Sequence, residues 1–82
     1  MKLFTIYDSK AQIYHAPFTQ RSTADAIRGF EKASKDQDSN IGRYPEDFVL
    51  FHIGDFDDAS CSLVPNNAPV SIARATEFTT SL

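Results

Sequence analysis

Three carboxylates stand within four positions of one another in the second half of the chain, at Asp55, Asp57 and Asp58. Carboxylate oxygens at such short spacing are the ligands that hard divalent cations need. A calcium-binding EF-hand loop that began at Asp55 would also need Gly at its sixth position and Glu at its twelfth. The chain has Ser60 and Asn66 there. We therefore expect a solvated hairpin turn that holds no metal, with weak metal affinity as the alternative.

Residues that could support catalysis are few and scattered. The two histidines, His15 and His52, do not suffice for a histidine metal site. No nucleophile elbow or comparable motif flanks a serine or the cysteine. The three glycines, Gly29, Gly42 and Gly54, stand too far apart for a phosphate-binding loop. We expect no catalytic residues, no cofactor and no enzymatic activity.

The chain has a single cysteine, Cys61, so it cannot form an internal disulfide or a thiolate metal cluster. Free cysteines usually behave as small apolar residues, and we expect Cys61 to be a half-buried strand residue. A reactive or intermolecular thiol is the alternative. The formal net charge of −3 is evidence against a protein that coats nucleic acid through bulk electrostatics. Any contact with DNA must come from a local patch.

One such patch is a basic stripe on a predicted helix. At 3.6 residues per turn, Arg28, Lys32 and Lys35 fall within about 60° of one another. The opposite side of that helix carries the apolar residues Ala26, Phe30 and Ala33. Arg21 would extend the stripe if the helical direction held for one more turn. We call Arg28, Lys32 and Lys35 the basic ridge.

Proteins that bind single-stranded nucleic acid combine a basic track for phosphates with aromatic faces on which bases stack. Tyr7, Tyr14 and Tyr44 are suitable aromatics, because a polar hydroxyl makes partial exposure acceptable. Together with the basic ridge and Arg21, they are our candidate binding residues for single-stranded DNA. The alternative is an ordinary solvated helix face, on which Glu31 pairs with Lys35 at i, i+4.

The first half of the chain predicts two strands and a helix. Lys2 to Asp8 mixes polar and apolar residues as a strand does, and a turn follows at Asp8. Gln12 to Phe18 predicts a shorter second strand that ends at Pro17, on a sheet edge. Ser22 offers an N-cap for a helix over Thr23–Lys35. We expect Gly29 of this helix to pack closely on the sheet, and residues 36–40 to form a solvated loop that Gly42 helps to turn.

The second half is built around one strand. Residues 48–53 are apolar on both faces, which is typical of a central strand. After the acidic turn at 54–58, residues 60–64 predict a hairpin partner that residues 65–67 end. The tail at 68–82 predicts a short strand or one helical turn, loosely ordered from about residue 79. We expect a single domain over 1–82.

The fold class expected is α+β, an antiparallel sheet of three to four strands with one amphipathic helix packed on one face. One helix cannot cover both faces of the sheet. Either the C-terminal segment or a second copy of the chain must cover the second face, which carries Val49, Phe51 and Ile53 or their opposite neighbours, and we favour a homodimer. No apolar run approaches the roughly 20 residues needed to cross a bilayer, and the opening lacks a signal-peptide core, so we expect a soluble, cytoplasmic protein.

Two segments carry a family resemblance: the opening MKLFTIYDSKA (residues 1–11) and the internal run YPEDFVLFHIGDFDD (residues 44–58). With the Pro17-Phe18 corner and the helix around residues 26–30, they resemble the small non-structural protein of gokushovirus-type microviruses, which are phages with single-stranded DNA genomes. The chain departs from that pattern at residues 36–40 and after Val64.

The resemblance implies an accessory role in the host cytoplasm, between genome replication and packaging, and it brings no catalytic residues. We therefore expect a phage protein that binds single-stranded DNA during genome synthesis or packaging. The alternative is a protein-interaction module that binds the phage replication initiator, the capsid assembly or a host protein through its sheet edge or its apolar face.

Overall fold

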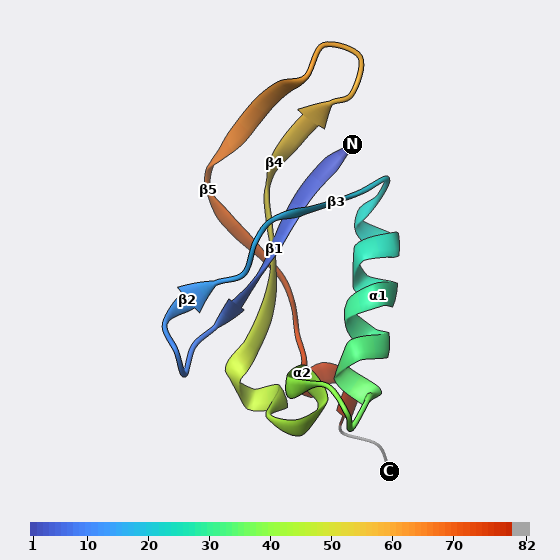
Figure 1. Ribbon diagram of the computed structural model, residues 1–82, viewed down its shortest axis with the longest axis vertical. Coiled ribbons are helices and arrows are strands. Elements are labelled where there is room, and N and C mark those ends of the chain that lie inside the picture. The colour runs from blue at the N-terminus through green and yellow to red at the C-terminus, as the bar shows by residue number, and fades with distance from the viewer. Residues whose placement is uncertain (80–82) are drawn as a thin grey trace.

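In the computed structural model of the protein, which describes residues 1–79, a five-stranded antiparallel sheet carries one long helix (Figure 1). The strands are β1 (Lys2–Asp8), β2 (Ile13–Tyr14), β3 (Phe18–Gln20), β4 (Phe48–Asp57) and β5 (Ser62–Arg74). The helices are α1 (Thr23–Lys35), α2 (Asn40–Arg43), the 3₁₀ turn η1 (Pro45–Asp47) and α3 (Thr76–Thr79). The predicted α+β class is confirmed, with one strand more than expected. None of the helices in residues 1–79 is long and apolar enough to span a bilayer.

The additional strand comes from the segment that follows β1. The Asp8 carboxylate accepts hydrogen bonds from the backbone N–H groups of Lys10 (3.0 Å) and Ala11 (3.2 Å), which turns the chain back. The returning segment pairs with β1 twice, first as β2 and then as β3, and it leaves the ladder between them. The prediction of one strand that ends at Pro17 was therefore wrong. Proline, which has no N–H to donate, lies in the gap between two short strands.

Helix α1 has the bounds that the sequence predicts. The Ser22 hydroxyl accepts a hydrogen bond from the backbone N–H of Asp25 at 3.1 Å, which confirms the predicted N-cap. The apolar side of the helix lies against one face of the sheet, where Phe30 joins the core. The buried core residues are Phe4, Ala26, Phe30, Phe48, Leu50, Ala73 and Ala75.

Two local predictions, about Gly29 and Cys61, were wrong. Gly29 is exposed, and a side chain at this position would meet nothing within 4 Å, so close packing does not explain it. The close approaches lie elsewhere: a Cβ atom at Gly42 would overlap the carbonyl of Asp36, and one at Gly54 would lie 2.6 Å from the Val64 oxygen. Cys61 is exposed in the turn before β5, at φ 62°, and is neither half-buried nor part of a strand.

Residues 65–67 do not end the hairpin as predicted, because β5 continues through them to Arg74. Residues 66–69 bulge out of the ladder between the pairs Gly54↔Pro65 and His52↔Val70. The Asn66 side-chain amide bridges this bulge by donating to the His52 carbonyl at 3.0 Å and contacting the ring nitrogen Nδ1 at 3.0 Å. The side-chain amide thus bonds to β4 where backbone pairing is interrupted, and β5 stays in the sheet.

The rest of the chain contains more regular structure than expected. The predicted loop at 36–40 ends in α2, whose first turn Ser39 caps by accepting from the Gly42 N–H at 3.0 Å. The tail forms both of the predicted alternatives, the end of β5 and the single turn α3. The predicted disorder from about residue 79 falls mainly on residues 80–82, which lie outside the described residues.

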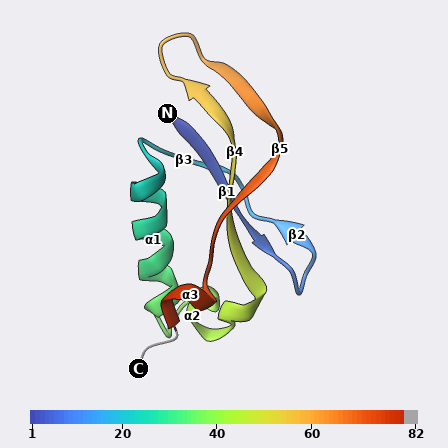
Figure 2. The same ribbon diagram turned by 180° about the vertical axis from the view of Figure 1, so that it is seen from behind.

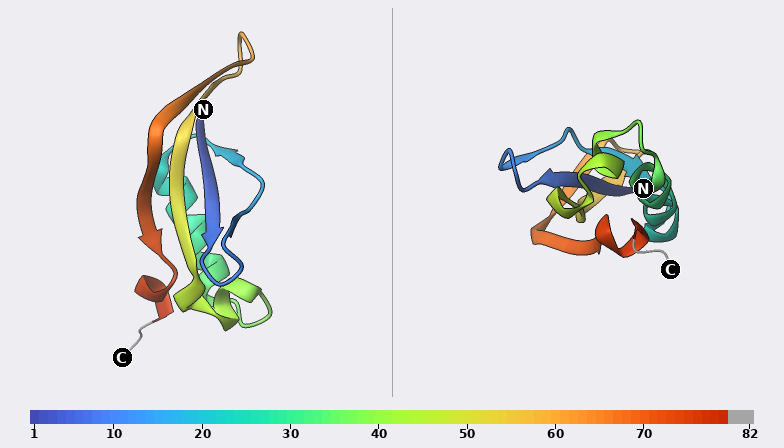
Figure 3. Two further views of the ribbon diagram at one scale, coloured as in Figure 1. Left: turned by 90° about the vertical axis from the view of Figure 1, so that its left-hand side faces the viewer. Right: turned by 90° about the horizontal axis from the view of Figure 1, so that it is seen from below.

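The two faces of the sheet differ. Helix α3 packs beside the end of α1, where the rings of Phe30 and Phe78 meet edge to face at 6.2 Å, so both helices lie on one face (Figure 2). The left panel of Figure 3 shows β1, β4 and β5 in front of α1, with no helix of residues 1–79 over the near face. The C-terminal segment, as far as residue 79, therefore does not cover this face, which we call the open face.

Candidate nucleic-acid interface

A row of side chains crosses the open face at right angles to the strands. The strand register places Tyr14 of β2 opposite Tyr7 of β1, Tyr7 opposite Val49 of β4, and Val49 opposite Arg74 of β5. Directly paired residues project from the same face of a sheet. Because neighbouring strands lie about 4.8 Å apart, the row extends for about 14 Å. It runs from two aromatic rings to an exposed guanidinium.

The aromatic end of the row is a three-ring cluster. The rings of Tyr7 and Tyr14 lie 4.5 Å apart between centroids, and Phe51 meets them edge-on at 6.4 Å and 6.0 Å respectively. Half of the Tyr14 surface is exposed, while Tyr7 and Phe51 are half-buried. Such a cluster can offer a stacking surface to planar ligands without first rearranging.

Of the predicted site residues, the structure brings Tyr7 and Tyr14 together. Phe51 and Arg74, which were not among the predicted site residues, lie on the same face. The sequence contained a signal for Phe51, because Phe51 lies two positions from Val49 in the same strand and their side chains therefore project from the same face. In the structure this is the face that α1 does not cover. Arg74 gave no such signal, because its place depends on the register of β5 with β4.

The basic ridge lies on α1, on the other side of the sheet. Arg28, Lys32 and Lys35 are exposed. Lys35 donates to Glu31 at 2.8 Å, as the alternative reading predicted, whereas Arg28 and Lys32 form no ion pair within residues 1–79. The sheet therefore separates the ridge from Tyr7 and Tyr14, and the predicted interface does not form one surface.

Arg21 does not extend the ridge. The helix begins at Thr23, and the capping residue before it is extended at φ −144° and ψ 161°. Arg21 instead lines a cleft together with the residues Met1, Lys2, Asp55, Phe56, Asp57, Asp58 and Val64. Three carboxylates share this cleft with Arg21, Lys2 and the N-terminal Met1, so its charges balance and Arg21 adds no basic track for phosphates.

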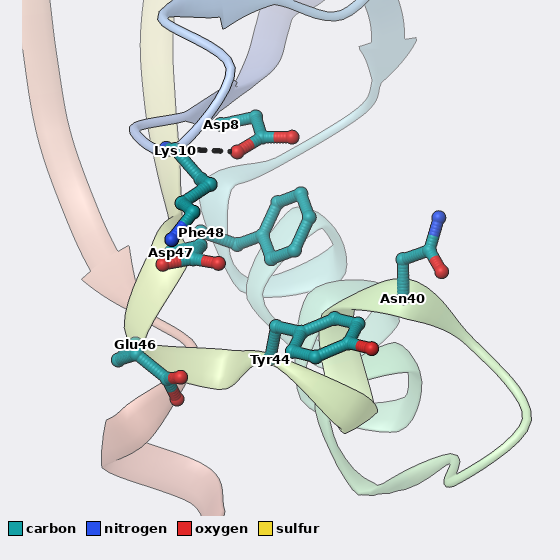
Figure 4. Close-up of a pocket in the computed structure, with 7 residues that line it drawn as sticks. All are labelled: Asp8, Lys10, Asn40, Tyr44, Glu46, Asp47 and Phe48. Atoms are coloured by element: carbon teal, nitrogen blue, oxygen red, sulfur yellow. Dashed lines mark hydrogen bonds between the residues drawn. The ribbon is translucent and has the colours of Figure 1, made fainter.

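Tyr44 lies at a fourth location, a cavity of about 400 Å³ at the end of β1 (Figure 4). The other residues that line this cavity are Asp8, Lys10, Asn40, Glu46, Asp47 and Phe48. Three carboxylates surround one lysine there, so the cavity is also unsuited to a polyanion. Tyr44 is 54% exposed and contributes to neither the ridge nor the open face.

The acidic turn has a structural role. The Asp57 carboxylate accepts a hydrogen bond from the Ala59 N–H at 2.9 Å, and this bond, together with one from the Ser60 side chain, lowers the pKa of Asp57. The neighbouring Asp55 lies 3.7 Å from His52 Nε2. Within residues 1–79, no three side chains of the metal-ligating types converge.

Comparisons with known proteins identify the family. The model of the Phage ORF5 protein family matches residues 1–78. Protein ORF5 of Chlamydia phage 1 is 39% identical over 83 aligned positions, which cover 95% of this chain and 86% of that protein. No solved structure matches the chain. The resemblance read from residues 1–11 and 44–58 is thereby confirmed, and the chain belongs to the Phage ORF5 family of small microvirus-type phage proteins.

Proposed function

We propose that this phage protein binds single-stranded DNA through its open sheet face. The observation that supports the proposal is the row across four strands, in which the rings of Tyr14 and Tyr7 lead to the Arg74 guanidinium. Sheet-based binders of single strands stack bases on aromatic side chains of an uncovered face and hold the backbone with cations. The aromatic cluster would take the bases and Arg74 a phosphate.

The charge balance predicts how such binding behaves. A protein with a net charge of −3 and one cation in the row cannot gain much from counterion release, so stacking must supply most of the affinity. Stacking requires bases that are not already stacked in a duplex. We therefore expect modest affinity, a shallow salt dependence and a preference for single strands over duplex DNA.

Fluorescence anisotropy with a labelled oligothymidylate and with a duplex of equal length, each at two salt concentrations, tests the proposal. The informative variant is Tyr14→Ala, and the matched control is Tyr44→Ala, since these tyrosines are 50% and 54% exposed but only Tyr14 lies on the open face. Tyr14→Ala should weaken binding by about 1–3 kcal/mol, the usual value of one stacked base. Equal effects of the two variants, or no binding by the unmodified protein, would contradict the proposal.

We also propose that a second copy of the chain covers the open face when DNA is absent. Val49, Phe51 and Ile53 are half-buried on this face, and no helix of residues 1–79 lies over them. A contiguous apolar face is usually an interface in soluble proteins. A homodimer of this kind and a DNA complex would compete for the same residues.

A role as a protein-interaction module is the second candidate, and the β4–β5 hairpin favours it. β5 is an edge strand, and its exposed apolar residues Leu63, Val64 and Val70 are 64%, 61% and 50% exposed. A partner strand could pair with this edge, as in β-augmentation. Salt distinguishes the candidates, because affinity for DNA falls with ionic strength whereas an apolar protein contact does not.

A further inference from the structure

A small hollow lies on the open face directly beside Tyr14, with a volume of about 270 Å³. Thr5 of β1 and Ile53 of β4 line it from the sheet, while its other lining residues come from the segment after β1 and from β5. These residues are Tyr14, His15, Pro17 and Pro69. The hollow therefore continues the aromatic cluster along the strands, away from Arg74.

The walls of the hollow are fixed before any ligand arrives. The Thr5 hydroxyl donates to the His15 carbonyl at 2.7 Å, and the His15 N–H donates to the Ile6 carbonyl at 2.8 Å. These bonds hold the segment between β2 and β3 beside the sheet. Pro17 and Pro69 add side chains that lose little conformational entropy. A ligand that enters therefore pays little to order its site.

The chemistry of the walls selects an apolar, planar group. No Asp, Glu, Lys or Arg side chain lines the hollow. The ring of His15 meets the core residue Phe48 edge-on at 5.9 Å. The Thr5 hydroxyl already donates its hydrogen to the His15 carbonyl. The volume lies below the roughly 300–1,000 Å³ of pockets that hold drug-sized ligands, which suits a single ring system.

We infer that the hollow receives one unstacked base of single-stranded DNA, next to a base stacked on Tyr14, and that it accepts any of the four bases. This inference rests on the function proposed above. Apart from Thr5, only Tyr14 and His15 bring polar side-chain atoms to the hollow, so its mainly apolar walls hold a base by its faces and contribute little to reading its edges. Because the base must leave its stack to enter, the hollow also adds to discrimination against duplex DNA.

The test compares Ile53→Phe, which fills the hollow from the sheet side, with Ile53→Val, which leaves it open. Oligothymidylate affinity should fall about tenfold in Ile53→Phe, the loss of one stacked base, and stay within about twofold in Ile53→Val. The unmodified protein should bind oligothymidylate, oligocytidylate and oligoadenylate with similar affinities. If thermal melting shows that Ile53→Phe is unfolded, Pro69→Phe fills the hollow from the edge strand instead.

Arg74→Gln, at the far end of the row, reports on the proposed function separately. If it weakens binding while a folded, filled variant binds as well as the unmodified protein, the hollow is overturned and DNA binding on the open face stands. A strong preference for one base also overturns the inference. If sedimentation shows that the filled variant no longer self-associates while its DNA affinity is unchanged, a second copy of the chain occupies the hollow and the inference is overturned. If the unmodified protein binds no oligonucleotide, the proposed function fails, and the inference with it.

Discussion

The division of the predicted interface can be tested by the salt dependence of DNA binding in two charge variants. One replaces Arg74 of the open face by glutamine, and the other replaces the ridge residues Arg28, Lys32 and Lys35 by glutamine together. Each phosphate contact contributes about 0.7 to the slope of log affinity against log salt for a single strand. If DNA lies on the open face, Arg74→Gln should flatten the slope by about 0.7, and the ridge variant should leave it unchanged.

The size of the protein limits the effect that the charges of the ridge have on DNA bound at the open face. The ridge variant changes the formal net charge from −3 to −6, which repels DNA at long range. The two shorter extents of the protein are 24 and 19 Å, whereas the Debye length is about 8 Å at physiological ionic strength. Charges on α1 are thus largely screened from a strand on the open face.

Neither variant should unfold the protein. The only ion pair of the ridge within residues 1–79 joins Lys35 to Glu31, whose side chains are 59% and 40% exposed. An exposed i, i+4 pair contributes about 0.3–0.5 kcal/mol, so the melting temperature should change by a few degrees at most. The slope is measured by anisotropy at four or more salt concentrations on proteins of verified fold. A slope that falls by about two units in the ridge variant and is unaffected by Arg74→Gln would place the DNA on α1 and refute the open-face proposal.

Four further predictions concern stability, assembly and metal binding. In thermal melts, Gly29→Ala should stabilise the protein by about 0.5–1 kcal/mol, because the position is helical and open. Gly54→Ala should destabilise the protein, since the new Cβ would lie 2.6 Å from the Val64 oxygen. The opposite ranking of the two variants would contradict the packing described for these glycines. Sedimentation at micromolar concentration should detect a dimer that oligothymidylate dissociates; a dimer that persists in the DNA complex would mean that the open face is not shared. Asp57→Asn should reduce stability at neutral pH, because a lowered pKa means that the ionised carboxylate favours the folded state, and the difference should disappear as the pH falls through that lowered pKa. An unchanged difference at acidic pH would show that the charge of Asp57 is irrelevant. Calorimetric titration of the same turn with calcium or magnesium should give no saturable heat.

The elements that follow from local chemistry could be predicted from the sequence. Strand β1 and helix α1 were predicted with the bounds that the structure shows, because alternation and an N-cap at Ser22 are encoded within a few residues. The length of β5 could not be predicted, because proline and asparagine usually end strands. Here Asn66 supplies a hydrogen bond to His52, fourteen positions away, and keeps the strand in the sheet.

The candidate site was predictable only in part, for a related reason. Residue type identified Tyr7, Tyr14 and the ridge as exposed groups, and strand parity could have identified Phe51. Whether these groups share a surface depends on which face of the sheet α1 covers, and this is decided by the packing of Phe30 against Phe4 and Leu50. Periodicity within one element carries no information about that choice.

The pairing of β1 with β4 also bears on how the protein folds. Met1 and Phe56 exchange backbone hydrogen bonds at 2.7 Å although they are 55 positions apart, and the rest of the β1–β4 ladder joins similarly distant residues. Helix α1, the β4–β5 hairpin and the pairing of β1 with β2 and β3 are local and can form early, but the β1–β4 ladder has to wait until most of the chain has collapsed. During synthesis β1 leaves the ribosome well before β4, its central partner, and pairs with it late. In that interval one edge of β1 stays unpaired and Phe4 and Ile6 lack their core partners, which makes β1 vulnerable to misassociation before folding is complete.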